Sequence, residues 1–240
     1  MTEDVLEVVL GVLAAGISAA IGWFTRTFLW RRRLRRKQRF LGLPRDSDAL
    51  LVVNRHAGRE DAVDRYDVFT LLELSALIKD CGAQARIVAH DLVRQGLGQQ
   101  AEFCVGGPVS NRRMAAHLRA FLPGVAVNTG LDPEGPADQC VFQVGTERYH
   151  LEKGNVEYVI LARLSAERGA RPVFLFCGQV AITNQAATRY LARHHRKLAR
   201  KYHDDSFCLL LKVVNSEAYG PDIVELVADV TRTAREPIPN

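Results

Sequence analysis

The N-terminal run of apolar residues, followed at once by arginines, constrains this chain more than any other feature. Residues 5–24 read VLEVVLGVLAAGISAAIGWF, and Glu7 is their only charged residue. Twenty helical residues span about 30 Å, the thickness of a bilayer's hydrocarbon core. RRRLRRKQR follows at 31–39. Because Lys and Arg favour the cytoplasmic side, the pattern predicts one transmembrane helix in the cell membrane, with the N-terminus outside and the C-terminal domain in the cytoplasm.

A cleaved signal peptide and a peripheral amphipathic helix are the alternatives to this anchor. In a signal peptide the positive charges precede the apolar run, whereas here they follow it. A surface-lying helix needs a polar face, and this run is apolar nearly all round. Small residues recur every four positions at Ala14, Ser18 and Gly22, which would suit helix packing in a homo-oligomer. We therefore expect contact with membrane lipid through residues 5–24 and the basic 31–39 run.

The positive charge of the chain is concentrated next to this segment. The net charge is +5, yet residues 26–45 hold nine bases and no acid, and residues 1–25 hold three acids and no base. The remaining residues, 46–240, therefore carry 23 bases and 24 acids. A domain with that balance lacks the basic surface of a nucleic-acid-binding protein, so no specific nucleic-acid binding is expected.

The cysteines indicate a reducing environment. There are five, at positions 81, 104, 140, 177 and 208, and no C-x-x-C pair occurs. An odd number, with several in apolar runs, favours reduced and buried thiols over disulfides.

Beyond a short linker, strand and helix patterns alternate. Strands are predicted at 49–54, 85–90, 102–106, 125–128, 158–164, 172–178 and 207–214, with a hairpin at 141–152. Helices are predicted at 67–82, 111–122, 183–202 and 221–234. Such alternation predicts an α/β domain, a Rossmann-like three-layer sandwich whose mainly parallel sheet gains a β-hairpin. The expected organisation is a transmembrane anchor at 1–30, a basic juxtamembrane linker at 31–47 and a cytosolic domain at 48–240.

Two strand-to-helix turns resemble each other. FCVGGPVSNRRMAAHL at 103–118 aligns without gaps on FCGQVAITNQAATRYL at 176–191. In open α/β sheets, ligands bind beyond the carboxyl ends of the strands. Both turns, with the loop after residues 49–54, are expected there. The candidate ligand-binding residues are Asn54, Arg55, His56, Gly58, Gly106, Gly107, Ser110, Asn111, Arg112, Gly178, Gln179, Thr183 and Asn184.

The Gly106-Gly107 turn suggests close approach of backbone N–H groups to an anion. Arg112 and Arg113 lie in the first turn of the next helix, where cations oppose the helix dipole unless an anion is bound. The alternative is that both arginines are solvated and the glycines only reverse the chain. Neither the Walker phosphate loop nor G-x-G-x-x-G is present.

Signatures of catalysis are weak. The chain has no G-x-S-x-G and no H-E-x-x-H, and Glu157 is more simply explained as a strand-edge acid than as a catalytic carboxylate. No catalytic residue, metal ligand or cofactor is assigned. We expect a membrane-anchored domain that binds a small anionic ligand, with a nucleotide as one candidate, in a sensor or signalling role. The alternatives are a nucleotide or sugar-phosphate hydrolase or transferase on the same fold, and a membrane-tethered interaction module without a ligand.

Overall fold

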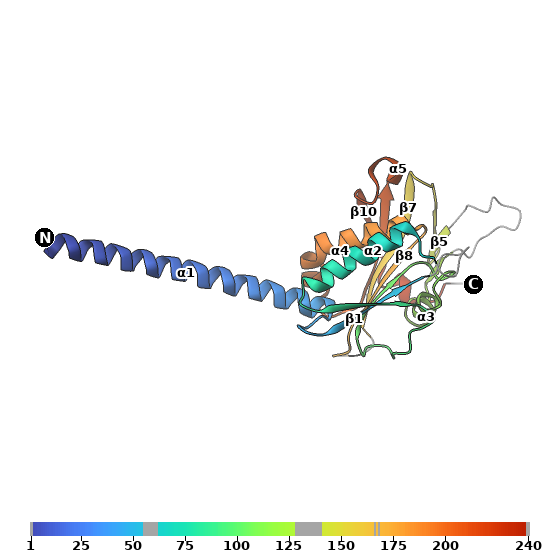
Figure 1. Ribbon diagram of the computed structural model, residues 1–240. Helices are drawn as coiled ribbons and strands as arrows, with labels where there is room; N and C mark the ends of the chain where they lie inside the picture. Colours follow the sequence, from blue (N-terminus) through green and yellow to red (C-terminus); the bar gives the residue numbers. More distant parts are fainter. Residues whose placement is uncertain (1, 55–61, 128–140, 166, 168, 239–240) are drawn as a thin grey trace, which may run out of the picture.

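A computed structural model describes residues 2–54, 62–127, 141–165, 167 and 169–238, and of residues 2–15 only the helical backbone. Its helices are α1 (Thr2–Leu41), α2 (Arg65–Lys79), α3 (Arg112–Phe121), α4 (Ala181–Tyr202), α5 (Ser216–Tyr219) and the 3₁₀ turn η1 (Thr233–Arg235). Its strands are β1 (Asp48–Val53), β2 (Gln84–Ala89), β3 (Ala101–Val105), β4 (Val125–Val127), β5 (Val141–Val144), β6 (Glu147–His150), β7 (Val156–Leu164), β8 (Val173–Gly178), β9 (Phe207–Val214) and β10 (Val224–Asp229). Figure 1 shows α1 projecting from the folded domain.

Seven strands form one mixed sheet in the order β10–β9–β7–β8–β3–β1–β2. β2, β1, β3 and β8 pair in parallel, whereas β7, β9 and β10 are joined through antiparallel pairs. β4, β5 and β6 make a separate antiparallel sheet. Of the strand pairs that join named strands, most are therefore antiparallel.

The prediction of a Rossmann-like, mainly parallel sheet is wrong. Parallel neighbours need a crossover of a dozen or more residues, usually through a helix. Residues 165–172 between β7 and β8 are too few, and the chain between β9 and β10 holds only the short α5, so these pairs are antiparallel. The predicted hairpin exists as β5–β6, but it belongs to the small sheet and does not extend the large one.

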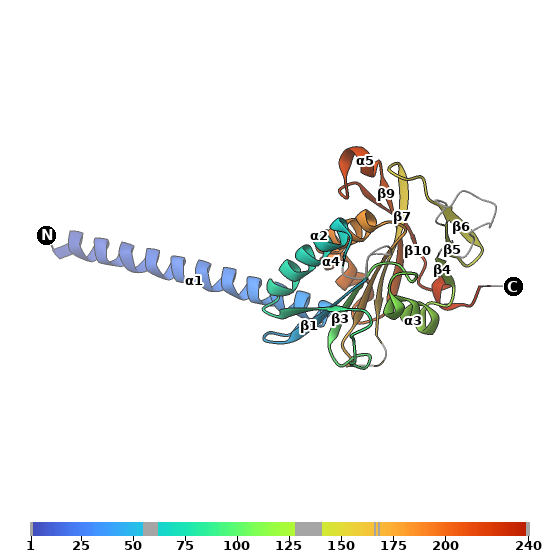
Figure 2. The same cartoon turned by 45° about the vertical axis from the view of Figure 1, so that its right-hand side comes forward.

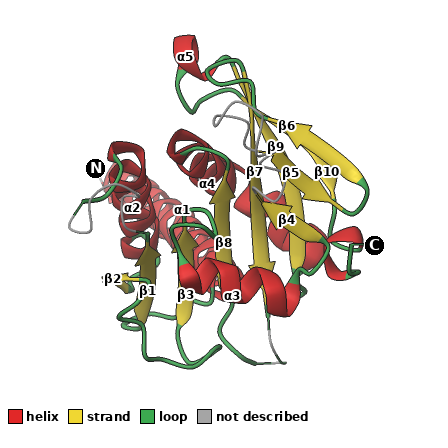
Figure 3. Ribbon diagram, turned by 90° about the vertical axis from the view of Figure 1, so that its right-hand side faces the viewer, coloured by secondary structure: helices red, strands yellow, loops and turns green. Residues whose placement is uncertain are grey.

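The five inner strands of the large sheet, β9, β7, β8, β3 and β1, contribute buried apolar side chains to both faces of the sheet. In β1, Leu51 and Val53 belong to the core cluster that contains α2 and α4 residues, whereas Leu50 and Val52 belong to the cluster shared with α3 and the small sheet. This continuous apolar pattern is expected for a strand that is covered on both sides. Figure 3 shows α2 and α4 on the face opposite α3.

The final helix predicted at 221–234 is also wrong. Residues 224–229 form the edge strand β10, and only Thr233–Arg235 are helical. VELVAD alternates enough to pair with β9 through a bulge between Leu226 and Ala228. Pairing with an otherwise unpaired strand edge outweighs the weak helical spacing of this segment.

The predicted transmembrane helix needs correction. No helix is long and apolar enough to cross a membrane within the part of the chain whose side chains are described. In α1 that part starts at Gly16, and only ten residues, 16–25, precede Arg26. About twenty are needed. Side chains 5–15 of the predicted span lie outside the described set. The predicted single-pass membrane location and its orientation depended on that helix, and the structure does not support them.

The C-terminal end of α1 is part of the domain instead. Residues 31–41 continue the helix, and Phe40, Leu41 and Leu43 are buried in the core cluster. The Phe40 ring stacks on Phe207 at 6.3 Å and meets Phe174 edge-on at 5.9 Å between ring centroids. Farther out, side chains such as Trp23 and Phe28 are exposed. Figure 2 shows the helix running away from the sheet after this docked end.

Candidate functional site

The three predicted turns do meet at one edge of the sheet. β1, β3 and β8 are neighbours and parallel, so their carboxyl ends lie side by side. Asn54, directly after β1, donates from Nδ2 to Ser110 Oγ at 3.1 Å. Ser110 belongs to the turn after β3 and lies close to Gly107 O, at 3.4 Å. Arg55, His56 and Gly58 lie outside the described residues.

Gly106 is required by this packing. Its φ is +104°, a conformation that side chains rarely adopt, and a Cβ there would lie 2.8 Å from Cγ of Asn54. At Gly107 an added Cβ would make only an ordinary contact, 3.8 Å from Gly178 O. Gly106 is therefore needed for the turn to pack against Asn54, whereas a side chain at position 107 would meet no such clash.

The turn into α3 offers an anion less than the sequence suggested. Asn111 caps the helix, since its Oδ1 accepts from Met114 N at 3.0 Å and its Nδ2 donates to Val105 O at 2.9 Å. The N–H of Arg112 points to Nδ1 of His90 at 3.4 Å, and the Arg112 side chain is exposed. Several donors of this first turn are thus already used.

Arg113 does not face a ligand site. It forms a two-pronged ion pair with Glu102, with nitrogen–oxygen distances of 2.8 and 2.6 Å, and His117 Nε2 lies 2.9 Å from the same carboxylate. Burial alone would raise the pKa of Glu102, but these hydrogen bonds and charges lower it to about 2. A carboxylate in a central strand has to be paired in this way. Glu102 inside the apolar run AEFCV was the sequence signal for such a partner.

The turn into α4 contains a buried series of hydrogen bonds. Asn184 Oδ1 accepts from Gly178 N at 2.8 Å, and its Nδ2 donates to Asp67 Oδ1 at 2.8 Å. Asp67 lies in the first turn of α2 and is 1% exposed. The two aligned asparagines, Asn111 and Asn184, therefore do different work, one capping its own helix and the other joining two helices and a strand end.

Asp67 has the perturbed carboxyl of this edge. Burial raises its pKa to about 6, against the opposing effect of hydrogen bonds from Asn184 and Asn54. Buried acids with such values gather at functional sites, although structural networks produce them too.

Two buried oxygens at this edge have no hydrogen-bond partner within the described part of the chain. They are Asn54 Oδ1 and Glu157 Oε2. Glu157 lies two residues before Val159, which pairs with Gly178 at the end of β8, so it shares the edge with Asn54. Its other oxygen accepts from Gly154 N at 2.9 Å, and the side chain is nearly fully buried. Buried acceptors are rarely left without a hydrogen bond, so each of these two oxygens is a place where a bound donor would be favourable.

The remaining predicted residues have structural contacts. Gln179 ties three strands together: its Oε1 accepts from Tyr158 N at 2.8 Å, and its Nε2 donates to Tyr149 O at 2.9 Å. Thr183 is buried, and its hydroxyl donates to Val180 O at 2.7 Å. α4 begins at Ala181, and its N-cap, Val180, offers no side-chain cap.

The cysteine prediction is confirmed for the described positions. Cys81, Cys104, Cys177 and Cys208 are free and buried, and burial raises the pKa of Cys81 to about 11. Cys140 lies outside the described residues. No group of three or more His, Cys, Asp or Glu side chains among the described residues is placed to hold a metal ion. Comparisons with protein families, with curated proteins and with solved structures give no match for this chain.

Proposed function

We propose that the chain binds a small anionic ligand that also carries hydrogen-bond donors, at the carboxyl edge of β1, β3 and β8. The observation that carries the proposal is the pair of buried acceptors without partners, Asn54 Oδ1 and Glu157 Oε2. Leaving such an atom unpaired costs about 1–3 kcal/mol, and ligand hydroxyl or amino groups would remove that cost. Among the described residues, no other group at this edge donates a hydrogen bond to these two oxygens.

The anionic group of the ligand is best accommodated at the start of α4. This helix has 22 residues, no side-chain cap and no acid in its first turn. Its first N–H groups point toward the edge and carry the positive end of the helix dipole. Because the first turn of α3 is already capped by Asn111, α4 replaces the Gly106-Gly107 turn as the favoured anion position.

A signalling role follows from which elements hold the ligand. Asp67 and Asn184 link α2 to α4 at the site. α4 also contacts both α1 and α2. A ligand at the start of α4 would therefore act on the helix layer to which α1 is docked.

An enzyme is the second candidate, and Asp67 is the observation in its favour. A carboxyl whose pKa is about 6 can give and take a proton near neutral pH, as a general acid or base must. The matching reaction is transfer or hydrolysis of a nucleotide or sugar phosphate. Asp67→Asn should then abolish turnover of a bound phosphate ester and spare its binding. Equal turnover by both proteins would remove the enzyme candidate.

The test of ligand binding is thermal unfolding of the full chain against a library of nucleotides, sugar phosphates and amino-carboxylates. A true ligand at 100 times its Kd should add about 2.7 kcal/mol to the unfolding free energy. Asn54→Ala should reduce the shift for that compound, whereas Arg148→Ala, an exposed change on β6, should not. A library without any stabilising compound, or one in which no stabilising compound loses its shift in Asn54→Ala, would contradict the proposal.

A further inference from the structure

A second charged site lies at the opposite edge of the sheet, where α1 joins the domain. A cavity of about 1280 Å³ opens there between the end of α1, the chain that connects β7 to β8, and the end of α4. Sites for small ligands commonly have volumes of about 300–1,000 Å³, so this space is sufficient for one. It faces the amino ends of β1, β3 and β8, away from Asn54 and Gly178.

The lining of this cavity is strongly basic. Six of its residues are arginines and three are acids. The arginines are Arg35, Arg39, Arg45, Arg163, Arg171 and Arg235, and the acids are Glu167, Asp204 and Asp205. An excess of like charges around one space is unfavourable unless an anion balances it.

Arg163 is already used by the fold. Its side chain is 3% exposed and donates to the main-chain oxygens of Phe40, Asp204 and Asp205 at 3.1, 2.6 and 3.0 Å. It therefore holds the end of α1 against the end of α4. The Asp204 carboxylate lies 4.0 Å from the same guanidinium, so among the described arginines of the lining it pairs with Arg163.

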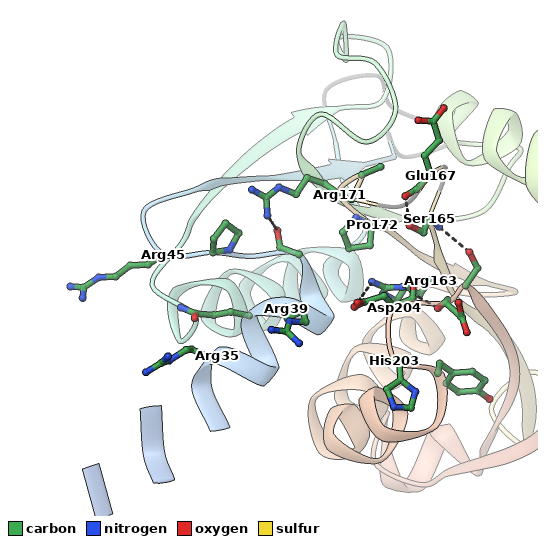
Figure 4. A pocket seen from close by; sticks show the side chains of 18 of the residues that line it. Arg35, Arg39, Arg45, Arg163, Ser165, Glu167, Arg171, Pro172, His203 and Asp204 are labelled. Atoms are coloured by element: carbon green, nitrogen blue, oxygen red, sulfur yellow. Dashed lines mark hydrogen bonds and ion pairs between the residues drawn. The ribbon is translucent and has the colours of Figure 1, made fainter. Parts of the chain in front are cut away.

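Of the remaining arginines in the lining, Arg45 pairs with Asp46 at 3.7 Å, and the others have no ion pair with an acid among the described residues. Among the described residues, the Arg171 side chain makes one hydrogen bond, from Nη1 to Gly42 O at 3.2 Å, which leaves most of its guanidinium donors unused. Within the described residues, Arg35 and Arg39 have no ion pair with an acid. Figure 4 shows Arg39 beside the Arg163–Asp204 pair, while Arg35 and Arg45 extend outward. Arg39 and Arg171 are thus the lining arginines that we expect to contact a bound group.

We propose that this cavity binds a phosphate-bearing small molecule, held by Arg39 and Arg171. Planar guanidinium groups with several N–H donors match phosphate oxygens in charge and geometry. Because the two arginines come from α1 and from the β7–β8 connection, the bound anion would join α1 to the domain. This site is separate from the one at the carboxyl edge and does not depend on it.

The test is titration calorimetry of the full chain with pyrophosphate and, in a second arm, with adenosine diphosphate. Arg39→Gln should weaken binding of both about tenfold or more, as expected when one charged hydrogen-bonding partner is lost. Arg32→Gln removes the same charge from an exposed position of the same helix outside the cavity, and it should change the affinity by less than twofold.

Three results would overturn the proposal. The first is that neither probe binds. The second is that Arg32→Gln and Arg39→Gln weaken binding equally, which would assign the anion to the whole basic helix. The third is that adenosine diphosphate binds and pyrophosphate does not, which would show that phosphate is not the recognised group. Asn54→Ala should leave pyrophosphate binding intact. Failure at this cavity is therefore distinguishable from failure of the carboxyl-edge site.

Discussion

Replacing Asp67 with Asn should change how stability depends on pH. Burial raises the pKa of Asp67 from 3.8 to about 6, so the folded protein holds this proton more tightly than the unfolded chain does. Stability is then lost as pH rises through the window from about 4 to about 6. The full loss is about 3 kcal/mol, since each pKa unit corresponds to about 1.4 kcal/mol. Between pH 4.5 and 7.5 the linkage relation gives about 2 kcal/mol of it.

Asn has nearly the same shape as Asp and does not titrate, so Asp67→Asn removes this one contribution. The assay is urea unfolding of wild type and variant at pH 4.5 and pH 7.5. Every other titrating group is common to both proteins and cancels in their difference. The variant should gain about 2 kcal/mol relative to wild type on going from pH 4.5 to pH 7.5. A difference that stays constant, or that shrinks with rising pH, would refute the buried-carboxyl reasoning.

Three further predictions follow from packing and charge. Phe40→Ala should cost about 3–5 kcal/mol in urea unfolding, whereas Phe28→Ala on the exposed part of α1 should stay within about 0.5 kcal/mol; equal costs would show that the end of α1 is not docked. The pKa of Glu102 is lowered to about 2, so its ion pairs stabilise the fold above about pH 4.5 and are lost toward pH 2. Glu102→Gln should therefore remove about 3 kcal/mol of acid-sensitive unfolding free energy, and an unchanged acid-unfolding profile would contradict this. Gly106→Ala should cost about 1–3 kcal/mol through its positive φ and its contact with Asn54, and Gly107→Ala, its matched control, about 0.5 kcal/mol or less; the reverse order would exclude the described turn.

Most elements of the domain could be predicted from local pattern, but their arrangement could not. The apolar runs of β1, β3 and β8 mark buried strands, and the asparagine after Ser110 marks a helix start. The direction of β7 depends on the short connection to β8, and a period-two pattern says nothing about which strand becomes a neighbour. The same limit explains β10, whose pairing with β9 is a contact made only in the folded sheet.

The candidate site shows the same division. Sequence order after parallel strands brought Asn54, Ser110 and Asn184 together correctly, because the carboxyl ends of β1, β3 and β8 share an edge. It could not show that Asn184 reaches Asp67, which is 117 positions away, or that Arg113 turns back to Glu102. Both contacts join side chains through tertiary packing, which no local spacing encodes.

The most direct test of a ligand site at the carboxyl edge is the affinity of the best compound from the stability screen, measured by calorimetry for three proteins. The proteins are wild type, Asn54→Ala and Arg39→Gln. The account predicts at least about tenfold weaker binding for Asn54→Ala, because one buried hydrogen bond to the ligand is lost. Binding by Arg39→Gln should match wild type. If the compound instead binds Asn54→Ala as tightly as wild type, its site is not the carboxyl edge of the sheet.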